Sequence, residues 1–417
     1  MFRYSGKALM HRILASCALI LSCIALPAIA QTAQPAPAQS APAQTMTPQQ
    51  ALTRLLTSGP VQASWFDPAF LAQIPVAQVQ QIVDQYTGQW GKLQRIEGSG
   101  ASYTVFMEHA SFPSKVYLNP QGQFAGLWFG AAAPIYASLD DAIRPFSQLP
   151  GNISLLVTDN GAAKASLHPD QPLAVGSAFK LAVLNALHQE ILAGKHRWDE
   201  VVPLDPAWKT LPSGVIRTWP DSTPITLATY ANQMISISDN TAADALLFIA
   251  GRTQVEAVSP RNTPFLSTRE AFVLKDPANA ALLARYRAAN VAGKCALLPE
   301  IDKLPLPDAS LFAKDPIATD IEWYFTPSEL CGLIDNVQNL GAMQINPGVA
   351  DKKDWKQIAY KGGSEPGILN LTTALTGNNG HHYCVAATWN NTAALDESRF
   401  FSLYAGALAS LAMESAK

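Results

Sequence analysis

The sequence is poor in charge and contains no cluster of basic residues. Of its 417 residues only 15% are charged, the formal net charge is −3, and no run of Lys or Arg occurs anywhere. Such a chain exerts no long-range attraction on a phosphate backbone, so we expect no nucleic-acid partner. Hydrophobic residues make up 48% of the chain, which is the balance of a soluble globular protein long enough for two domains.

Cysteine is also scarce, with five residues in all. Cys17 and Cys23 fall in the first thirty residues, which leaves Cys295, Cys331 and Cys384 for the rest of the chain. Three thiols cannot all pair, so we expect either one disulfide, between Cys295 and Cys331, or three ordinary buried thiols. None of the cysteines has zinc-ligand spacing, and we expect no metal and no other cofactor.

Residues 1–30 have the pattern of a secretory signal peptide. Lys7 and Arg12 precede an apolar stretch over 13–26, and small residues end at Ala30, where cleavage is expected. The apolar stretch is shorter than the ~20 residues that a spanning helix needs. A lipoprotein-like box at 14–17 lies too close to Arg12 for lipidation. The mature protein is therefore expected to be periplasmic or secreted, with no stable membrane insertion.

A Pro/Ala/Gln-rich tract at 31–46 reads as an extended linker, and a first domain at 47–145 follows it. Helical periodicity at its start gives way to alternating strands, with a hairpin around the turn Asn119–Gly122. Helices followed by a small antiparallel sheet predict an α+β domain of ordinary size.

The second domain, 146–417, has β-rich segments at both of its ends. A hairpin is predicted around Asn160-Gly161, and three more strands are predicted near the C-terminus, before an amphipathic helix over 396–413. The later strands span 357–361, 368–375 and 382–389. Long helical stretches occupy the middle, which predicts a sheet drawn from both ends of the domain with a helical insertion between.

Ser177 and Lys180 form an S-x-x-K motif at the start of a helix. The spacing places both side chains on one helix face. A partly desolvated Lys has a lowered pKa and can take the proton of a serine, which makes the hydroxyl nucleophilic. Alone, this spacing is equally typical of a helix-capping Ser followed by an exposed Lys.

Two further short motifs change that interpretation. Ser238-Asp239-Asn240 precedes an Ala-rich helix, and Lys361-Gly362-Gly363-Ser364 ends a predicted strand. Separately, the first is typical of a helix cap and the second of a strand-terminating turn. Together with S-x-x-K, in this order, they resemble the S-x-x-K, S-D-N and K-T-G set of class A β-lactamases and penicillin-binding proteins. The resemblance runs from Ile153 to the C-terminus and includes Leu211-Pro212-Ser213-Gly214.

This resemblance implies a fold and a site. The fold is an α+β β-lactamase/transpeptidase-like domain, an antiparallel sheet flanked by helices with a helical insertion, preceded by the small α+β domain. It implies Ser177 as nucleophile, Lys180 as its base, Ser238 as proton shuttle to the leaving group and Lys361 as the cation of the carboxylate-binding strand.

The same resemblance implies the groups that hold the substrate. Asn240 would contact a substrate amide, and Gly363 and Ser364 would belong to the substrate-binding strand. The oxyanion hole would consist of the backbone N–H groups of Ser177 and Ser364.

Two departures bear on the substrate and on turnover. Gly362 stands where K-T-G has Thr, so the hydroxyl that binds a β-lactam carboxylate is missing. Glu270 is the nearest candidate for the deacylating base, but it lacks the Leu-Asn pair that follows that base in the family. A salt bridge to Arg269 or to another surface partner is its alternative role.

The first domain resembles, more weakly, the steroid-isomerase or cystatin-like (NTF2-like) domain that precedes the catalytic domain in serine hydrolases of the clavulanate-pathway type. The sequence thus predicts an exported serine hydrolase acting on a β-lactam or another small amide or ester. A D,D-peptidase acting on cell-wall peptides and an acylated sensor that does not turn over are the alternatives.

Overall fold

The computed structural model describes residues 46–130 and 132–415. The predicted signal peptide at 1–30 and the linker as far as residue 45 lie outside these residues. Among the helices described, none combines the length and the apolar character needed to cross a bilayer.

The first domain packs helices against an antiparallel sheet. Helix α1 (Pro48–Thr57) is capped by Thr47. The Thr47 side chain accepts from the Gln50 N–H, and the Gln50 side chain accepts from the Thr47 N–H, which forms a capping box. The sheet has the order β1-β2-β3-β4, and β3 and β4 form the hairpin predicted around residues 119–122. The remaining elements are α2 (Pro68–Leu71), α3 (Val76–Trp90), β1 (Leu93–Ser99), β2 (Ser102–Met107), β3 (Ala110–Leu118), β4 (Phe124–Phe129) and β5 (Ala133–Pro134).

The second domain is built on an antiparallel sheet of order β12-β13-β14-β6-β7. Its strands are β6 (Asn152–Asp159), β7 (Ala162–Leu167), β12 (Gln357–Glu365), β13 (Ile368–Thr376) and β14 (His382–Asn390). Strand β14 pairs with β6, so the sheet joins the two ends of the domain as the sequence predicts. Strand β12 is at the edge and carries Lys361 to Ser364.

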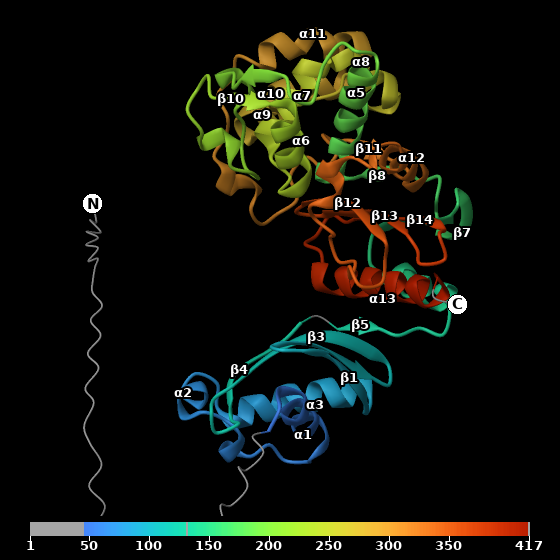
Figure 1. Ribbon diagram of the computed structural model, residues 1–417. Helices are drawn as coiled ribbons and strands as arrows, with labels where there is room; N and C mark the ends of the chain where they lie inside the picture. The colour runs from blue at the N-terminus through green and yellow to red at the C-terminus, as the bar shows by residue number, and fades with distance from the viewer. Residues whose placement is uncertain (1–45, 131, 416–417) are drawn as a thin grey trace, which may run out of the picture. The chain divides into compact units, whose positions relative to one another are not determined.

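One face of this sheet is covered by α13 (Glu397–Ser415), together with α4 (Leu139–Ile143). Figure 1 shows α13 running along the sheet, on the side away from the helical group of this domain. Phe146, Trp389 and Phe400 meet in this core with ring centroids 5.5 Å and 5.9 Å from Phe400. Because Leu139, Ile143 and Phe146 belong to this core, the packing of the second domain begins before the junction expected at residue 145.

Helices and short strands between β7 and β12 make a second core against the other face. Figure 1 shows α5 to α11 gathered there. These elements are β8 (Leu173–Ala174), α5 (Lys180–Leu192), β9 (Val201–Pro203), β10 (Pro224–Thr226), α6 (Leu227–Ser236), α7 (Asn240–Ala250), α8 (Arg252–Val258), α9 (Thr268–Lys275), α10 (Ala280–Ala288), α11 (Val291–Ile301), β11 (Tyr324–Phe325) and α12 (Pro327–Val337).

A disulfide fastens α12 to the sheet. It joins Cys331 of α12 to Cys384 of β14, with Cα atoms 5.8 Å apart. The expected pairing of Cys295 with Cys331 is wrong, because Cys295 lies exposed on α11 as a free thiol while Cys331 packs directly over β14.

Candidate active site

Ser177 lies in a short turn, Gly176–Phe179, that leads directly into α5. The backbone of this turn passes very close to β12. A Cβ on Gly176, whose φ is +49°, would lie 3.1 Å from the backbone nitrogen of Ser364, and one on Gly363 would collide with the backbone nitrogen of Ser177. Glycine at both positions therefore brings together the two N–H groups expected to form the oxyanion hole.

Lys180 is fully buried, and its amine lies at the centre of a hydrogen-bond network. Its Nζ is 3.1 Å from Ser177 Oγ and 3.0 Å from Ser238 Oγ. It donates to the Ser238 carbonyl oxygen at 2.5 Å and to Asn240 Oδ1 at 2.6 Å. These last two bonds use two amine hydrogens, which leaves a lone pair for the Ser177 hydroxyl when Lys180 is neutral.

Burial favours that neutral form. Desolvation, and after it the nearby charge of Lys361, holds the pKa of Lys180 well below its usual range. A lysine whose pKa is lowered in this way has the property required of a general base.

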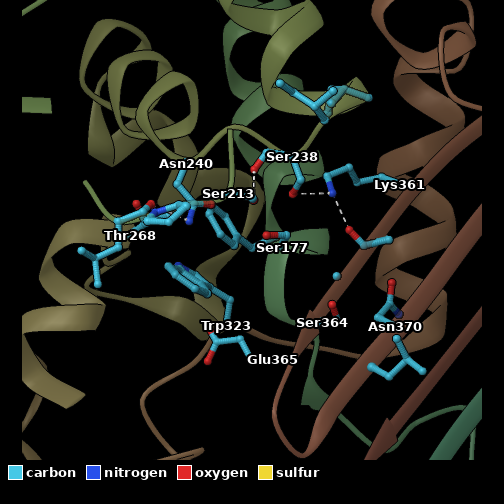
Figure 2. Close-up of a pocket in the computed structure, with 18 of the residues that line it drawn as sticks. Ser177, Ser213, Ser238, Asn240, Thr268, Trp323, Lys361, Ser364, Glu365 and Asn370 are labelled. Carbon is cyan, nitrogen blue, oxygen red and sulfur yellow. Dashed lines mark hydrogen bonds between the residues drawn. The ribbon is translucent and has the colours of Figure 1, made fainter. Parts of the chain in front are cut away.

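Ser238 connects the two lysines. It precedes α7 and has a φ of +59°, a left-handed conformation that is costly for a serine. In this conformation its carbonyl oxygen accepts from Lys180 and, at 2.7 Å, from Ser213 Oγ. Its hydroxyl lies between Lys180 Nζ and Lys361 Nζ, the latter at 3.1 Å, and Figure 2 shows the bond from Ser238 to Lys361.

Lys361 is 2% exposed, and its Nζ also donates to the carbonyl oxygen of Gly362. Desolvation lowers the pKa of Lys361 to about 7. The side chains of Ser177, Lys180, Ser238 and Lys361 thus form one continuous hydrogen-bonded series, drawn from a turn, a helix, a loop and a strand.

This series opens onto a cavity of about 570 Å³. The predicted site residues that line it are Ser177, Ser238, Asn240, Lys361, Gly363 and Ser364. Aromatic side chains form part of its wall, where Phe179 and Trp323 stack with ring centroids 3.8 Å apart. An apolar wall with polar groups converging on one serine is the usual form of a small-molecule site.

Asn240 faces this cavity but is already engaged inside the protein. Its Oδ1 accepts from Lys180, and its Nδ2 donates to the carbonyl oxygen of Leu211 at 3.2 Å. One of the two Nδ2 hydrogens remains for a substrate amide.

Glu270 does not reach the cavity, although its α9 neighbours Thr268 and Ala271 do. It is fully buried and forms a two-pronged salt bridge to Arg252, with N to O distances of 2.9 and 2.7 Å. It also completes a capping box with Ser267. This geometry holds the Glu270 carboxylate away from the cavity. The salt bridge expected as its alternative role is present, but its partner is Arg252 of α8 and not Arg269.

Two buried acids near the site hold the backbone in place. Asp239 accepts from the N–H groups of Val215 and Ile216 at 2.6 and 2.8 Å. Asp244 accepts from the backbone N–H of Thr268 at 2.7 Å, and burial raises its pKa to about 7. No local pattern in the sequence indicates these roles, since each joins segments more than twenty residues apart.

Among the described residues that line the cavity, Glu365 is the only acidic one. Its Oε2 accepts from Lys275 Nζ at 2.5 Å, and Lys275 also donates to the fully buried Glu322. This cluster fastens the end of β12 to α9. In the described residues no group of three or more His, Cys, Asp or Glu side chains is arranged to hold a metal ion.

Part of the second domain is similar to a known protein family. Residues 135–268, which contain the S-x-x-K and S-D-N motifs, match the model of the beta-lactamase enzyme family. No curated protein matches the chain.

Among solved structures the chain is similar to a β-lactamase from Sphaerobacter thermophilus, with 17% identity over 67% of this chain and 97% of the other and a TM-score of 0.48. It is also similar to PBP-A, with 16% identity, 66% and 95% coverage and a TM-score of 0.43. A third similar structure is an ancestral class A β-lactamase, with 15% identity, 66% and 99% coverage and a TM-score of 0.46.

The matched family model begins at residue 135, beyond the strands of the first domain, so it does not define the type of that domain. For the second domain, the predicted fold class is confirmed: the matched family model and the antiparallel sheet flanked by helices give it a mixed α and β, β-lactamase-like fold.

Proposed function

We propose that this protein is an exported serine hydrolase that forms an acyl-enzyme on Ser177 with a β-lactam or another small amide or ester. The observation that carries the proposal is the unbroken contact series from Ser177 through Lys180 and Ser238 to Lys361, at the wall of a substrate-sized cavity.

In the acylation step, Ser177 Oγ attacks the acyl carbonyl carbon while Lys180 Nζ takes the hydroxyl proton. The lowered pKa of Lys180 and its contact of 3.1 Å with Ser177 support this role. The carbonyl oxygen, which becomes negative, accepts from the backbone N–H groups of Ser177 and Ser364. Losing one such donor typically costs ~10²–10³ in rate.

The leaving group then receives a proton along the path from Lys180 to Ser238. Ser238 Oγ, 3.0 Å from Lys180 Nζ, passes its own proton to the leaving nitrogen or oxygen and is reprotonated by Lys180. The C–N or C–O bond breaks, and the ester on Ser177 remains.

Deacylation is expected to be slower than acylation in this cycle. It needs a water held and deprotonated beside the ester carbonyl, and Glu270 is held by Arg252 away from the cavity. Glu365 lines the cavity, but its carboxylate is bound by Lys275. Since a positioned base is typically worth ~10²–10⁴ in rate, we propose that the adduct persists and that steady-state hydrolysis is slow.

The test is to mix the protein with benzylpenicillin, short-chain esters and D-Ala-D-Ala peptides, and to follow Ser177 by intact-protein mass spectrometry beside steady-state assays. A long-lived adduct with slow turnover supports the proposal. Rapid peptide release would favour the D,D-peptidase alternative, and no adduct with any class would refute an acyl-enzyme. The engaged state of Glu270 also favours the second candidate, an acylated sensor, whose adduct would outlast many hours.

We also propose export to the periplasm or beyond, with cleavage after Ala30. The disulfide between Cys331 and Cys384 supports it, because such bonds persist in oxidising compartments. The N-terminal sequence of the mature protein tests the cleavage site. For the first domain we propose the steroid-isomerase or NTF2-like type, which its order of helices followed by an antiparallel sheet supports.

A further inference from the structure

A second cavity, of about 480 Å³, shares Trp323 with the active-site cavity. It lies among the segment 261–266, helices α10 and α11, and the segment 320–324. Figure 2 shows Trp323 among the side chains around the active-site cavity. The volume is within the usual range of small-molecule sites. None of the four residues of the acylating series lines this second cavity, so it is distinct from the site already described.

The charged groups of the second cavity leave one cation without an acidic partner. Arg287 donates two bonds to Asp320, at 2.7 and 2.6 Å. Glu322 accepts from a lysine that does not line the cavity. Lys294 takes part in none of the ion pairs among the described residues, and its amine lies 5.2 Å from the centre of the Tyr286 ring. The cavity therefore has an excess of positive charge.

The same cavity offers a second cation and flat apolar surfaces. Arg261 is bound to Glu329 by a single contact of 3.1 Å and keeps further donors free. The rings of Tyr286, Trp323 and Tyr324 belong to the wall. Cationic donors beside aromatic rings match a small carboxylate with a flat apolar body.

The segment 322–324 joins this cavity to the turn that carries the nucleophile. The Trp323 carbonyl oxygen accepts from the Val175 N–H at 3.0 Å, two residues before Ser177. The Trp323 ring stacks on Phe179, with centroids 3.8 Å apart. A displacement of this segment therefore acts on one of the two backbone donors expected to form the oxyanion hole.

The same segment also reaches the other donor. Glu322 accepts from Lys275, and Lys275 donates to Glu365 at 2.5 Å. Glu365 directly follows Ser364 at the end of β12. Three consecutive residues thus contact the second cavity on one side and both halves of the oxyanion hole on the other. Because packed segments of this kind deform little, a ligand held against them changes the placement of both donors.

We propose that the second cavity binds a small aromatic carboxylate through Lys294 and Arg261, and that its occupancy strengthens the placement of the backbone N–H groups beside Ser177. The ligand is an effector and not the acyl donor, since the cavity contains no part of the acylating series. A filled cavity leaves the segment 322–324 less room to move, so acylation is faster with the effector bound.

Binding is tested by calorimetry with indole-3-acetate and with indole-3-acetamide, which has the same flat body without the charge. We expect the acid to bind the wild type ~10-fold more tightly than the amide, because a hydrogen bond to a charged group contributes about that much. Lys294→Gln should remove most of this difference, and Lys294→Arg should retain it. Lys303→Gln is the matched control, since Lys303 is exposed and lies just after α11.

Three results would overturn the binding site. They are no binding of the acid to the wild type, equal binding of acid and amide, and binding of the acid to Lys294→Gln that is as tight as to the wild type.

Transmission to the active site has two readouts. With indole-3-acetate bound, backbone hydrogen exchange of the segments 173–179 and 361–365 should slow. The limiting rate of Ser177 acylation by benzylpenicillin should rise ~5-fold, at the lower end of usual coupling between sites. Lys294→Gln should show neither change. An unchanged exchange and rate overturn the transmission. A rise in the half-saturating concentration alone places the probe in the active-site cavity and also overturns the proposal.

Failure of the proposed function is read separately. If no acyl donor labels Ser177, the acyl-enzyme is wrong, and calorimetry and hydrogen exchange still decide the second cavity. If Ser177 is labelled but indole-3-acetate does not bind, the acyl-enzyme stands and the effector site is wrong.

Discussion

Two regions beside the cavity use buried charge in opposite ways. Around Ser177 two buried lysines, Lys180 and Lys361, lie together with serine and carbonyl oxygens between them and no carboxylate in direct contact. Along α9 each buried ionic group has a partner of opposite charge: Glu270 binds Arg252, and Lys275 binds Glu322 and Glu365. The first arrangement lowers the pKa of its lysines, and the second joins α9 to neighbouring segments through ion pairs.

The pKa values of the buried lysines shift in opposite directions in the two regions. Burial works to lower the pKa of Lys275, but the charges of Glu322 and Glu365 outweigh burial and raise it. Burial lowers the pKa of Lys361, and it lowers that of Lys180 as well, because the charges of Asp239, Asp244 and Glu365 are too weak there to offset it. Similar burial therefore accompanies a raised pKa in one region and lowered pKa values in the other, because only Lys275 has carboxylates in direct contact.

The largest expected effect comes from breaking the first region at its nucleophile. Ser177→Ala should abolish covalent labelling by penicillins and by serine-directed acylating reagents, because it removes the attacking oxygen. Intact-protein mass spectrometry measures this, and an unchanged thermal unfolding midpoint controls for folding. Labelling that persists in the variant would contradict the assignment of Ser177 as the nucleophile.

The second largest effects are expected from replacing Lys180 and Lys275 separately by methionine. Lys180→Met should slow acylation by ~10²–10⁴, the usual value of a positioned base, while stability is kept or raised because a desolvated amine is removed. Lys275→Met should instead cost about 3–5 kcal/mol of unfolding free energy, since it leaves buried carboxylates uncompensated. Urea unfolding and acylation rates on both variants check this, and similar stability losses in the two would contradict the comparison.

Glu270→Gln tests whether the ion pairs along α9 contribute to stability and not to deacylation. We expect a loss of about 3–5 kcal/mol in unfolding free energy, because Arg252 is left without its buried partner, and almost no change in the deacylation rate of the penicillin adduct. Chemical unfolding and the decay of the adduct are the two measurements. Rapid turnover in the wild type that disappears in this variant would show that Glu270 is the base after all.

The smallest effect concerns pH. The protonated form of Lys361 binds an anion, and its pKa is lowered to about 7, so affinity for benzylpenicillin should fall as pH rises through that value. The protonated fraction changes about tenfold between pH 6 and pH 8, which bounds the effect. Titration of Ser177→Ala avoids the separate influence of Lys180 on chemistry, and benzylpenicillin methyl ester, in which the carboxylate is masked, is the control. Affinity for the acid that stays flat over this range would place the carboxylate away from Lys361.

Local sequence patterns predicted much of this fold and of the group of residues around Ser177. The hairpins at 152–167 and 110–129 and the three late strands follow from alternation and turn residues that lie close together in the chain. Ser177, Lys180, Ser238 and Lys361 carry motifs whose spacing is local, and the structure places them together.

What the sequence did not predict depends on pairs of distant segments. Arg252 for Glu270, and Cys384 for Cys331, are choices among several chemically equal candidates that are settled by how helices pack.

The pairing of β14 with β6 also governs when the second domain can fold. Asn160 and His382, which are hydrogen-bonded, are 222 positions apart in the sequence, so this part of the sheet cannot close until nearly all of the polypeptide has been made. Pairings of such long sequence separation form slowly, because the entropy of closing the loop is lost before any contact compensates for it. We therefore expect the approach of the Ser364 N–H to Ser177 to be among the last contacts of the second domain to form, because β12 takes its place in the sheet only through β13 and β14.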